Sequence, residues 1–234
     1  MQQHIFDDKA TLAEHFGQLL LQMSQEKEKV YIALSGGSTP KAIFDHLAEN
    51  YQKQLPWERL YFFWGDERCV APDHADSNYG MTKTHLFDKV PVPADNIFRV
   101  KGELDPTKAA EAYEIQIDRS LPQENNLPAF DLMLLGMGDD GHTASIFPHE
   151  MELWDSPLLC EVATHPESGQ KRVTLTGKVI NNARHILFLV TGSNKAEKVQ
   201  EIIKQSGQWH NYPAARTNAD KTTWLLDKDA AALL

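Results

Sequence analysis

Hydrophobic residues follow two different periods along the chain, and the changes between them mark the expected elements. Between residues 10 and 23 they recur every three or four positions, which is typical of an amphipathic helix. Residues 30–34 (VYIAL) are instead a short continuous apolar run. Such a run is typical of a strand that is buried on both faces of a parallel sheet.

The same alternation continues to the end of the chain. Further strands are expected at residues 60–64, 130–135, 160–163, 172–176, 185–190 and 222–226. A second helix is expected to begin with Pro40 as its first residue, after Ser38 or Thr39 as N-cap. Another helix is expected over residues 107–121, and residues 65–96 are the least regular part of the chain.

This strand–helix alternation without a long linker predicts an α/β fold. We expect a mainly parallel, Rossmann-like sheet with helices on both faces. The length of 234 residues and the 41% of hydrophobic residues suit a single domain over residues 1–234. Because ligands bind beyond the carboxyl ends of the strands in open α/β sheets, the polar clusters that follow the strands are candidates for chemistry.

Composition and charge indicate which kinds of binding partner the protein can have. A formal net charge of −10 argues against nucleic acid and anionic membranes. The chain has two cysteines, no metal-ligand spacing, no leader pattern and no run of about 18 apolar residues. We therefore expect a cytoplasmic protein without a metal, whose partner is a small molecule. If that molecule is an anion, local groups must hold it.

The first polar cluster after a strand consists of Ser35, Gly36, Gly37, Ser38 and Thr39. Two glycines allow the backbone to approach a ligand closely, and the hydroxyls with the N–H groups of the following helix form an anion site. The alternative is a tight turn in which the Ser and Thr side chains only cap the helix. The lysine of a Walker loop is missing, so nucleotide binding is not implied.

The second cluster, residues 136–142 (GMGDDGH), also follows a strand. It matches G-x-G-x-x-G, but two carboxylates would face the pyrophosphate and no clean crossover helix follows, so we reject a dinucleotide site. What remains is a glycine-rich turn that can expose His142, with Asp140 near enough to orient it. Histidine is the usual general base near neutral pH, although a purely structural histidine is the alternative.

Three cations, Arg68, Arg172 and Lys195, follow or begin strand-like runs. A phosphate dianion needs such groups, although each of them could also be a solvated surface charge. Ser145 is not expected to be a nucleophile, because its surroundings lack the G-x-S-x-G pattern. Glu67 is expected to pair with a neighbouring base.

Several clusters stand in a characteristic order along the chain. They are residues 33–40 (ALSGGSTP), 64–68 (WGDER), 76–79 (DSNY), 136–148 (GMGDDGHTASIFP), 172–176 (RVTLT) and 192–196 (GSNKA). Together they resemble the motifs of the 6-phosphogluconolactonase family, within the glucosamine-6-phosphate isomerase/6-phosphogluconolactonase group. The resemblance spans almost the whole chain.

The resemblance implies a hydrolase of the oxidative pentose phosphate pathway that opens 6-phospho-D-glucono-1,5-lactone to 6-phospho-D-gluconate. It implies a fold of the sugar-phosphate isomerase type and no cofactor, and it leaves a monomer or a homodimer open. Glucosamine-6-phosphate deaminases share a related Asp-Gly-His turn, but theirs continues into a Phe-Asn-Glu-Pro run, whereas residues 144–148 here are ASIFP. The deaminase is therefore the alternative, and a non-catalytic sugar-phosphate sensor is a further one.

The resemblance also suggests roles for the candidate residues in lactone opening. His142 would serve in turn as base and acid, and either Asp140 or Asp66 would orient it or hold sugar hydroxyls.

The phosphate would be held by the loop of residues 35–39 together with nearby cations. The resemblance supports Arg68 and Lys195 as ligand contacts more strongly than Arg172.

Overall fold

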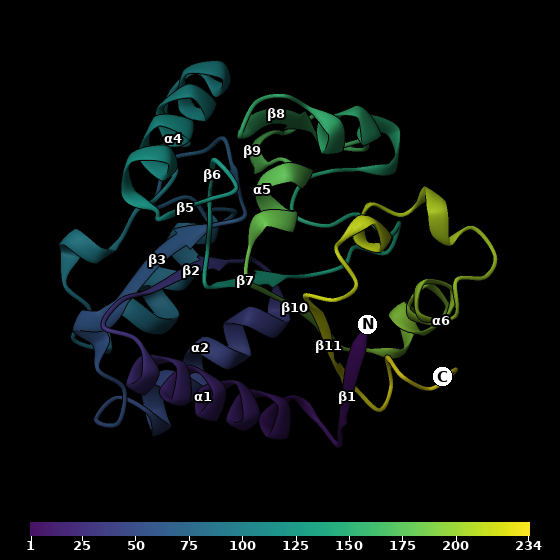
Figure 1. Ribbon diagram of the computed structural model, residues 1–234, viewed down its shortest axis with the longest axis horizontal. Helices are drawn as coiled ribbons and strands as arrows, with labels where there is room; N and C mark the ends of the chain where they lie inside the picture. Colours follow the sequence, from purple (N-terminus) through teal and green to yellow (C-terminus); the bar gives the residue numbers. More distant parts are fainter.

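The computed structural model describes residues 1–234 and is built on a six-stranded parallel sheet of order β1-β11-β10-β7-β2-β3 (Figure 1). Its strands are β1 (Gln2–Phe6), β2 (Val30–Leu34), β3 (Leu60–Trp64), β7 (Leu132–Leu135), β10 (His185–Val190) and β11 (Thr222–Asp227). A three-stranded antiparallel sheet contains β4 (Asp66–Arg68), β9 (Lys171–Leu175) and β8 (Cys160–Thr164), in that order. A small hairpin joins β5 (Gln123–Glu124) to β6 (Leu127–Pro128).

The helices cover both faces of the six-stranded sheet (Figure 1). They are α1 (Lys9–Glu26), α2 (Ser38–Asn50), α3 (Asn78–Thr82), α4 (Pro106–Ser120), α5 (Gly177–Asn182) and α6 (Ala196–Lys204). Successive side chains of a strand point to opposite faces. In β7, Leu132 and Leu134 pack with α1 and α2, whereas Met133 and Leu135 pack with α4, α5 and α6. The expected fold class is confirmed.

Local signals explain where the two long helices begin. Asp8 accepts a hydrogen bond from the backbone N–H of Thr11 and forms a capping box at the start of α1. Asp105 caps α4 by accepting from the backbone N–H groups of Thr107 and Lys108, with Pro106 as the first helical residue. The strands at residues 30–34, 60–64 and 185–190 have the expected bounds, and the other expected strands differ by one or two residues. None of the helices combines the length and the apolar character needed to cross a bilayer.

The start of α2 differs from the prediction. The helix begins at Ser38, its N-cap is Gly37, and Pro40 is the third helical residue rather than the first. Gly37 has a φ of 107°, a backbone conformation that favours glycine, and it is the last of the three residues between β2 and α2. Pro40 is tolerated in the first turn because its missing N–H has no intrahelical partner there.

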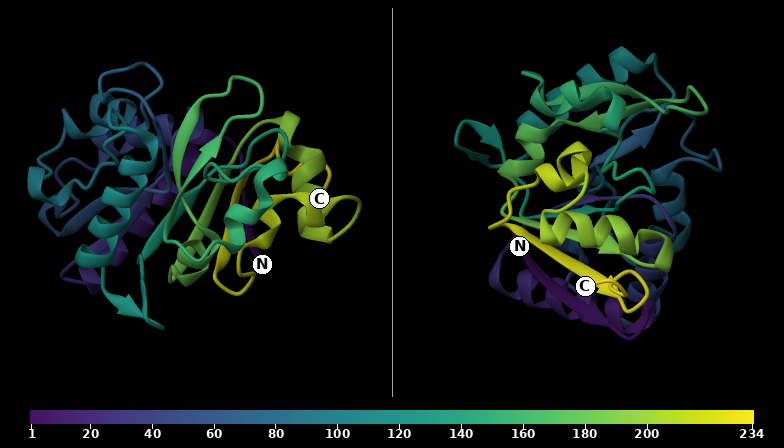
Figure 2. Two further views of the ribbon diagram at one scale, coloured as in Figure 1. Left: turned by 90° about the horizontal axis from the view of Figure 1, so that it is seen from above. Right: turned by 90° about the vertical axis from the view of Figure 1, so that its right-hand side faces the viewer.

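The two sheets meet at the carboxyl ends of β2 and β3. Gly65 alone separates β3 from β4; its N–H donates to Leu34 O and its carbonyl accepts from Leu175 N, both at 2.9 Å. The segment of residues 65–96 therefore starts at the sheet edge where ligands bind in such folds. Figure 2 shows both chain ends at the opposite end of the molecule from this segment, near β1 and β11.

Candidate active site

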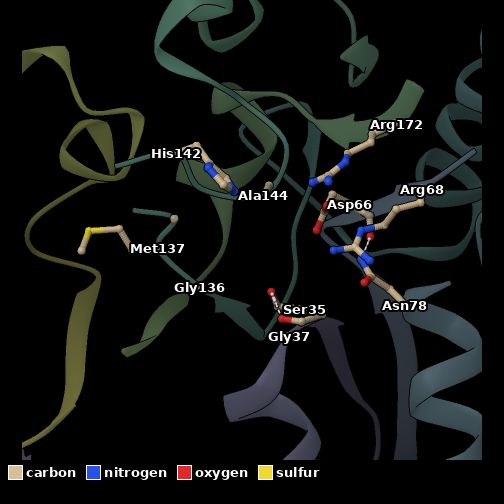
Figure 3. Close-up of a pocket in the computed structure, with 12 residues that line it drawn as sticks. Ser35, Gly37, Asp66, Arg68, Asn78, Gly136, Met137, His142, Ala144 and Arg172 are labelled. Carbon is tan, nitrogen blue, oxygen red and sulfur yellow. Dashed lines mark hydrogen bonds between the residues drawn. The ribbon is translucent and has the colours of Figure 1, made fainter. Parts of the chain in front are cut away.

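A cavity of about 190 Å³ opens at the carboxyl ends of β2, β3 and β7, beside the three-stranded sheet (Figure 3). Its lining residues are Ser35, Gly36, Gly37, Asp66, Arg68, Asn78, Gly136, Met137, Gly138, His142, Ala144 and Arg172. Residues from five separate segments thus meet at the place expected from the fold. Figure 3 shows His142 on one side of the cavity and Asp66, Arg68 and Arg172 on the other.

His142 is oriented by Asp140 and not by Asp66. Asp140 Oδ1 accepts hydrogen bonds from His142 Nδ1 at 2.6 Å and from the His142 backbone N–H at 3.0 Å. Because a carboxylate only accepts, the proton of the neutral ring lies on Nδ1 and leaves Nε2 as the basic nitrogen. The His142 ring also packs on Phe147, with 4.6 Å between ring centroids.

The carboxyl group of Asp140 is suited to stabilise a positive imidazolium. Burial raises its pKa, but the hydrogen bonds and the charge of His142 lower it more, to about 2. Asp140 therefore stays ionised at every pH near neutrality. A proton taken up by His142 would meet a fixed negative charge.

The loop that carries the histidine, residues 136–146, is here called the base loop. Two internal hydrogen bonds close it around His142, since Thr143 Oγ1 donates to Gly136 O and Gly138 N donates to His142 O, both at 2.9 Å. Ala144 has a φ of 48°, which is uncommon for a residue other than glycine. Such a conformation persists where its surroundings hold it, so the base loop is a rigid support for His142.

The opposite side of the cavity is formed by β4 and β9, here called the arginine strands. Arg68 and Arg172 are cross-strand partners in this antiparallel pair. Arg172 is only 9% exposed, its side chain donates no hydrogen bond within the protein, and its guanidinium lies 5.6 Å from the Phe147 ring centroid. Arg68 donates to Asp76 O at 2.5 Å, but its buried Nε has no partner.

These two guanidinium groups are chemically suited to hold an anion. Burial lowers the pKa of Arg172, and the neighbouring charge of Arg68 lowers it further. Two adjacent cations with unused donors gain most from a doubly charged anion, which restores both hydrogen bonds and charge balance. Asp66, Asp76 and Glu67 lie near enough to offset part of this positive charge.

The loop of residues 35–39 contributes the N-terminus of α2. No side chain caps this helix, so the capping role considered for Ser38 and Thr39 is wrong. The Thr39 hydroxyl instead lies 2.8 Å from that of Thr191, and neither Ser38 nor Thr39 lines the cavity. Ser35, Gly36 and Gly37 do line it. Free backbone N–H groups at this end of a helix favour negative charge.

Glu67 does not pair with a base, contrary to the prediction. Its buried carboxylate accepts from the backbone N–H groups of Arg68, Asn78 and Tyr79 at 2.7–2.8 Å and from Ser77 Oγ at 3.1 Å. It thereby fixes the segment that presents Asn78 to the cavity. Asn78 was not among the expected site residues, because no chemical pattern distinguishes it from other residues of the 76–79 motif.

Lys195 lies outside the set that lines the cavity. Its ammonium group forms an ion pair with Asp139, which also accepts from Asn194 Nδ2 at 2.8 Å. The structure therefore brings Arg172 into the cavity wall but not Lys195, the reverse of the order that the sequence resemblance suggested. No group of three or more His, Cys, Asp or Glu side chains is arranged to hold a metal ion.

Comparisons with known proteins agree on one family. A model described as "Glucosamine-6-phosphate isomerases/6-phosphogluconolactonase" matches residues 7–225. The chain is 47% identical over 202 residues to 6-phosphogluconolactonase from Treponema pallidum, covering 86% of this chain and 84% of that one.

Solved structures give the same result. The crystal structure of the devB protein has a TM-score of 0.94 and 44% identity, and the match covers 99% of this chain and 98% of the other. A monomeric glucosamine-6-phosphate deaminase of the NagB superfamily has a TM-score of 0.85 with full coverage of both chains. Its identity is 20%, so that likeness concerns the fold alone.

Proposed function

The chain belongs to the glucosamine-6-phosphate isomerase/6-phosphogluconolactonase family, and from that premise we propose that it hydrolyses 6-phospho-D-glucono-1,5-lactone to 6-phospho-D-gluconate. One observation carries the proposal: an Asp140-oriented His142 faces, across a single cavity, two arginines whose buried Nε groups have no partner. A base at one end and a dianion site at the other suit a phosphorylated ester. The similarity to a 6-phosphogluconolactonase at 47% identity supports the same substrate.

Hydrolysis of the lactone needs a base, an acid and a binding site for the remote phosphate. His142 Nε2 takes a proton from water as the water oxygen attacks C1 of the lactone, and Asp140 stabilises the resulting imidazolium. The imidazolium then gives a proton to the ring oxygen as the bond from C1 to that oxygen breaks. Each turnover thus consumes one water and leaves a carboxylic acid and a hydroxyl group.

The phosphate is held by Ser35, Gly36 and Gly37 at the start of the 35–39 loop, together with Arg68 and Arg172. Binding energy from this remote group fixes the lactone carbonyl near the base, which can supply several kcal/mol of the barrier. Lys195 lies near the base rather than at the phosphate, because its ion-pair partner Asp139 directly precedes Asp140.

The organisation proposed with this activity is one domain over residues 1–234, either a monomer or a homodimer, without nucleic acid or membrane partners. A cytoplasmic location is supported by the phosphorylated substrate and by two cysteines that are both free.

The first experiment separates this activity from the deaminase alternative. The purified protein is incubated with freshly generated 6-phosphogluconolactone and, separately, with glucosamine 6-phosphate. We expect acid release above spontaneous hydrolysis in the first reaction and no ammonia in the second. Ammonia without acid release would replace the proposal with the deaminase, and neither product would favour a sensor.

A second experiment tests the assignment of the base. We expect His142→Ala to lower kcat by about 10²-fold or more while inorganic phosphate still competes for the site. His185→Ala is the matched control, since His185 is exposed at the amino end of β10 and should leave kcat unchanged. Full turnover by His142→Ala would remove His142 from the mechanism.

A further inference from the structure

Ser145 has no part in the chemistry described above, yet its hydroxyl makes a direct hydrogen bond between the two sides of the cavity. Ser145 Oγ donates to Asp66 Oδ2 at 2.7 Å. Ser145 is 0% exposed and Asp66 is 6% exposed. The bond is therefore shielded from water and made to a charged acceptor, the class of hydrogen bond that contributes most.

The backbone of Ser145 strengthens the same connection. Its N–H donates to Thr174 Oγ1 at 3.2 Å, and Thr174 is the cross-strand partner of Asp66. Ser145 thus contacts both members of one residue pair on the arginine strands. Two bonds to neighbouring strands prevent the base loop from sliding along either of them.

A shift of Ser145 would also move His142, because backbone hydrogen bonds fix the residues between them. Ile146 N donates to Thr143 O at 3.0 Å, and Thr143 and Ile146 form a β-bridge. Ala144 lies between them in its left-handed conformation. On the other side, Asp66 is two residues from Arg68 on the same strand. The bond therefore connects the support of the base with the support of the anion site.

The bond also leaves one carboxylate oxygen of Asp66 without a donor from the protein. Ser145 occupies Oδ2, and no protein group donates to Oδ1. Asp66 lines the cavity beside Arg68 and Arg172 (Figure 3). Oδ1 is thus free to accept a hydrogen bond from a hydroxyl group of a substrate bound in the cavity.

We propose that Ser145 is a positioning residue, which through Asp66 sets the distance and angle between the His142 base and the arginine pair. The inference rests on the lactone hydrolysis proposed above. A substrate held at its phosphate presents its carbonyl to the base only when that separation is right. Loss of the bond should therefore affect the chemical step more than phosphate binding.

The test compares Ser145→Ala with the wild-type protein in the lactone assay, corrected for spontaneous hydrolysis. We expect kcat to fall about tenfold or more. The inhibition constant of inorganic phosphate should change less than twofold, because both arginines remain. This split between kcat and phosphate affinity would not arise if the hydroxyl only stabilised the fold.

A control variant removes a comparable hydroxyl elsewhere. Ser24 is also 0% exposed, and its hydroxyl donates to Leu21 O at 2.7 Å within α1. Ser24→Ala should keep the wild-type kcat. Should Ser145→Ala not fold, Ser145→Cys carries the test, since a thiol is a weak donor of similar size and should also lower kcat.

The possible failures are distinguishable. A wild-type protein without lactonase activity would overturn the proposed function itself. An active wild type with an unchanged kcat in a folded Ser145 variant would overturn only the role of Ser145. A kcat loss matched by an equal loss of phosphate affinity would also overturn it, because the cation site itself would then be damaged.

Discussion

Replacing Gly36 with alanine tests the packing of the cavity wall most directly. A Cβ on Gly36 would lie 1.9 Å from Asn78 Oδ1 and 2.6 Å from Asn78 Cγ, well inside van der Waals contact. The Asn78 amide cannot simply turn away, because the residue is 3% exposed and its Nδ2 donates to Asp66 O at 2.9 Å. The substitution must therefore either break the hydrogen bond from Asn78 to Asp66 or displace the loop that carries residue 36.

The expected cost follows from the bond that is lost. Displacing the amide leaves two buried polar groups without partners, the Asn78 amide and the Asp66 carbonyl, at about 1–3 kcal/mol each. Gly36→Ala should lower the free energy of unfolding by about 2–6 kcal/mol. At about 2–4 °C per kcal/mol for a chain of this size, Tm should fall by roughly 4–24 °C. The kcat/KM for the lactone should fall as well, since both residues line the cavity.

Urea unfolding followed by tryptophan fluorescence measures this change, and two variants control it. Gly136→Ala places the same methyl group in the same cavity, but its nearest neighbour is Ser35 Oγ at 3.9 Å, an ordinary contact. It should cost less than about 1 kcal/mol. Asn78→Ala removes the obstacle, so Gly36→Ala should cost less than about 1 kcal/mol in that background.

Two results would refute the reasoning. One is a Gly36→Ala variant as stable as the wild type. The other is a variant whose loss of stability is the same with and without the Asn78 side chain, because the clash would then not be its cause.

Three further predictions concern charged groups. Asp140→Asn should lower kcat about tenfold with little change in KM, because a half-exposed carboxylate that steadies an imidazolium contributes about 1–2 kcal/mol; steady-state kinetics with a normal kcat would contradict this. Arg172→Ala should raise KM more than Lys195→Ala, since only the arginine lines the cavity without a protein partner, and equal KM values would count against this. The hydrogen bond from Arg99 lowers the pKa of Glu103 to about 2, so the wild type should exceed Glu103→Gln in stability by at most about 1 kcal/mol near neutral pH. Because the folded-state pKa is depressed, that difference should disappear as pH falls from about 4.5 to about 2 in urea titrations, and a difference that persists at pH 2 would exclude the ion pair as its source.

Much of the fold follows from local patterns in the sequence. The continuous apolar runs predict five of the six strands of the parallel sheet, since a strand covered on both faces needs apolar side chains on both. The largely exposed edge strand β1 has no such run and was not predicted. The 3.6-residue period predicts α1, because one face of that helix must pack on the sheet. The pairing of His142 with Asp140 is also a local matter, as two residues on one tight turn lie within reach of each other.

The tertiary structure alone decided which distant residues share the site. Arg172 faces Arg68 because of the register of two antiparallel strands, and no periodicity along the chain specifies a register between strands. Lys195 is withdrawn from the cavity by a contact with Asp139, which only the packing of the two loops creates. Glu67 illustrates the same limit, since a carboxylate beside an arginine in the sequence binds backbone N–H groups in the fold.

The sequence by itself therefore determined most of the elements, the order of the motifs and the turn that carries the base, because each depends on residues that are neighbours along the chain. Only the tertiary structure decided how the base loop and the arginine strands meet, through Ser145 and Asp66. The reason is physical: periodicity specifies which face of an element is buried, whereas the distance between two functional groups depends on how separate elements pack together.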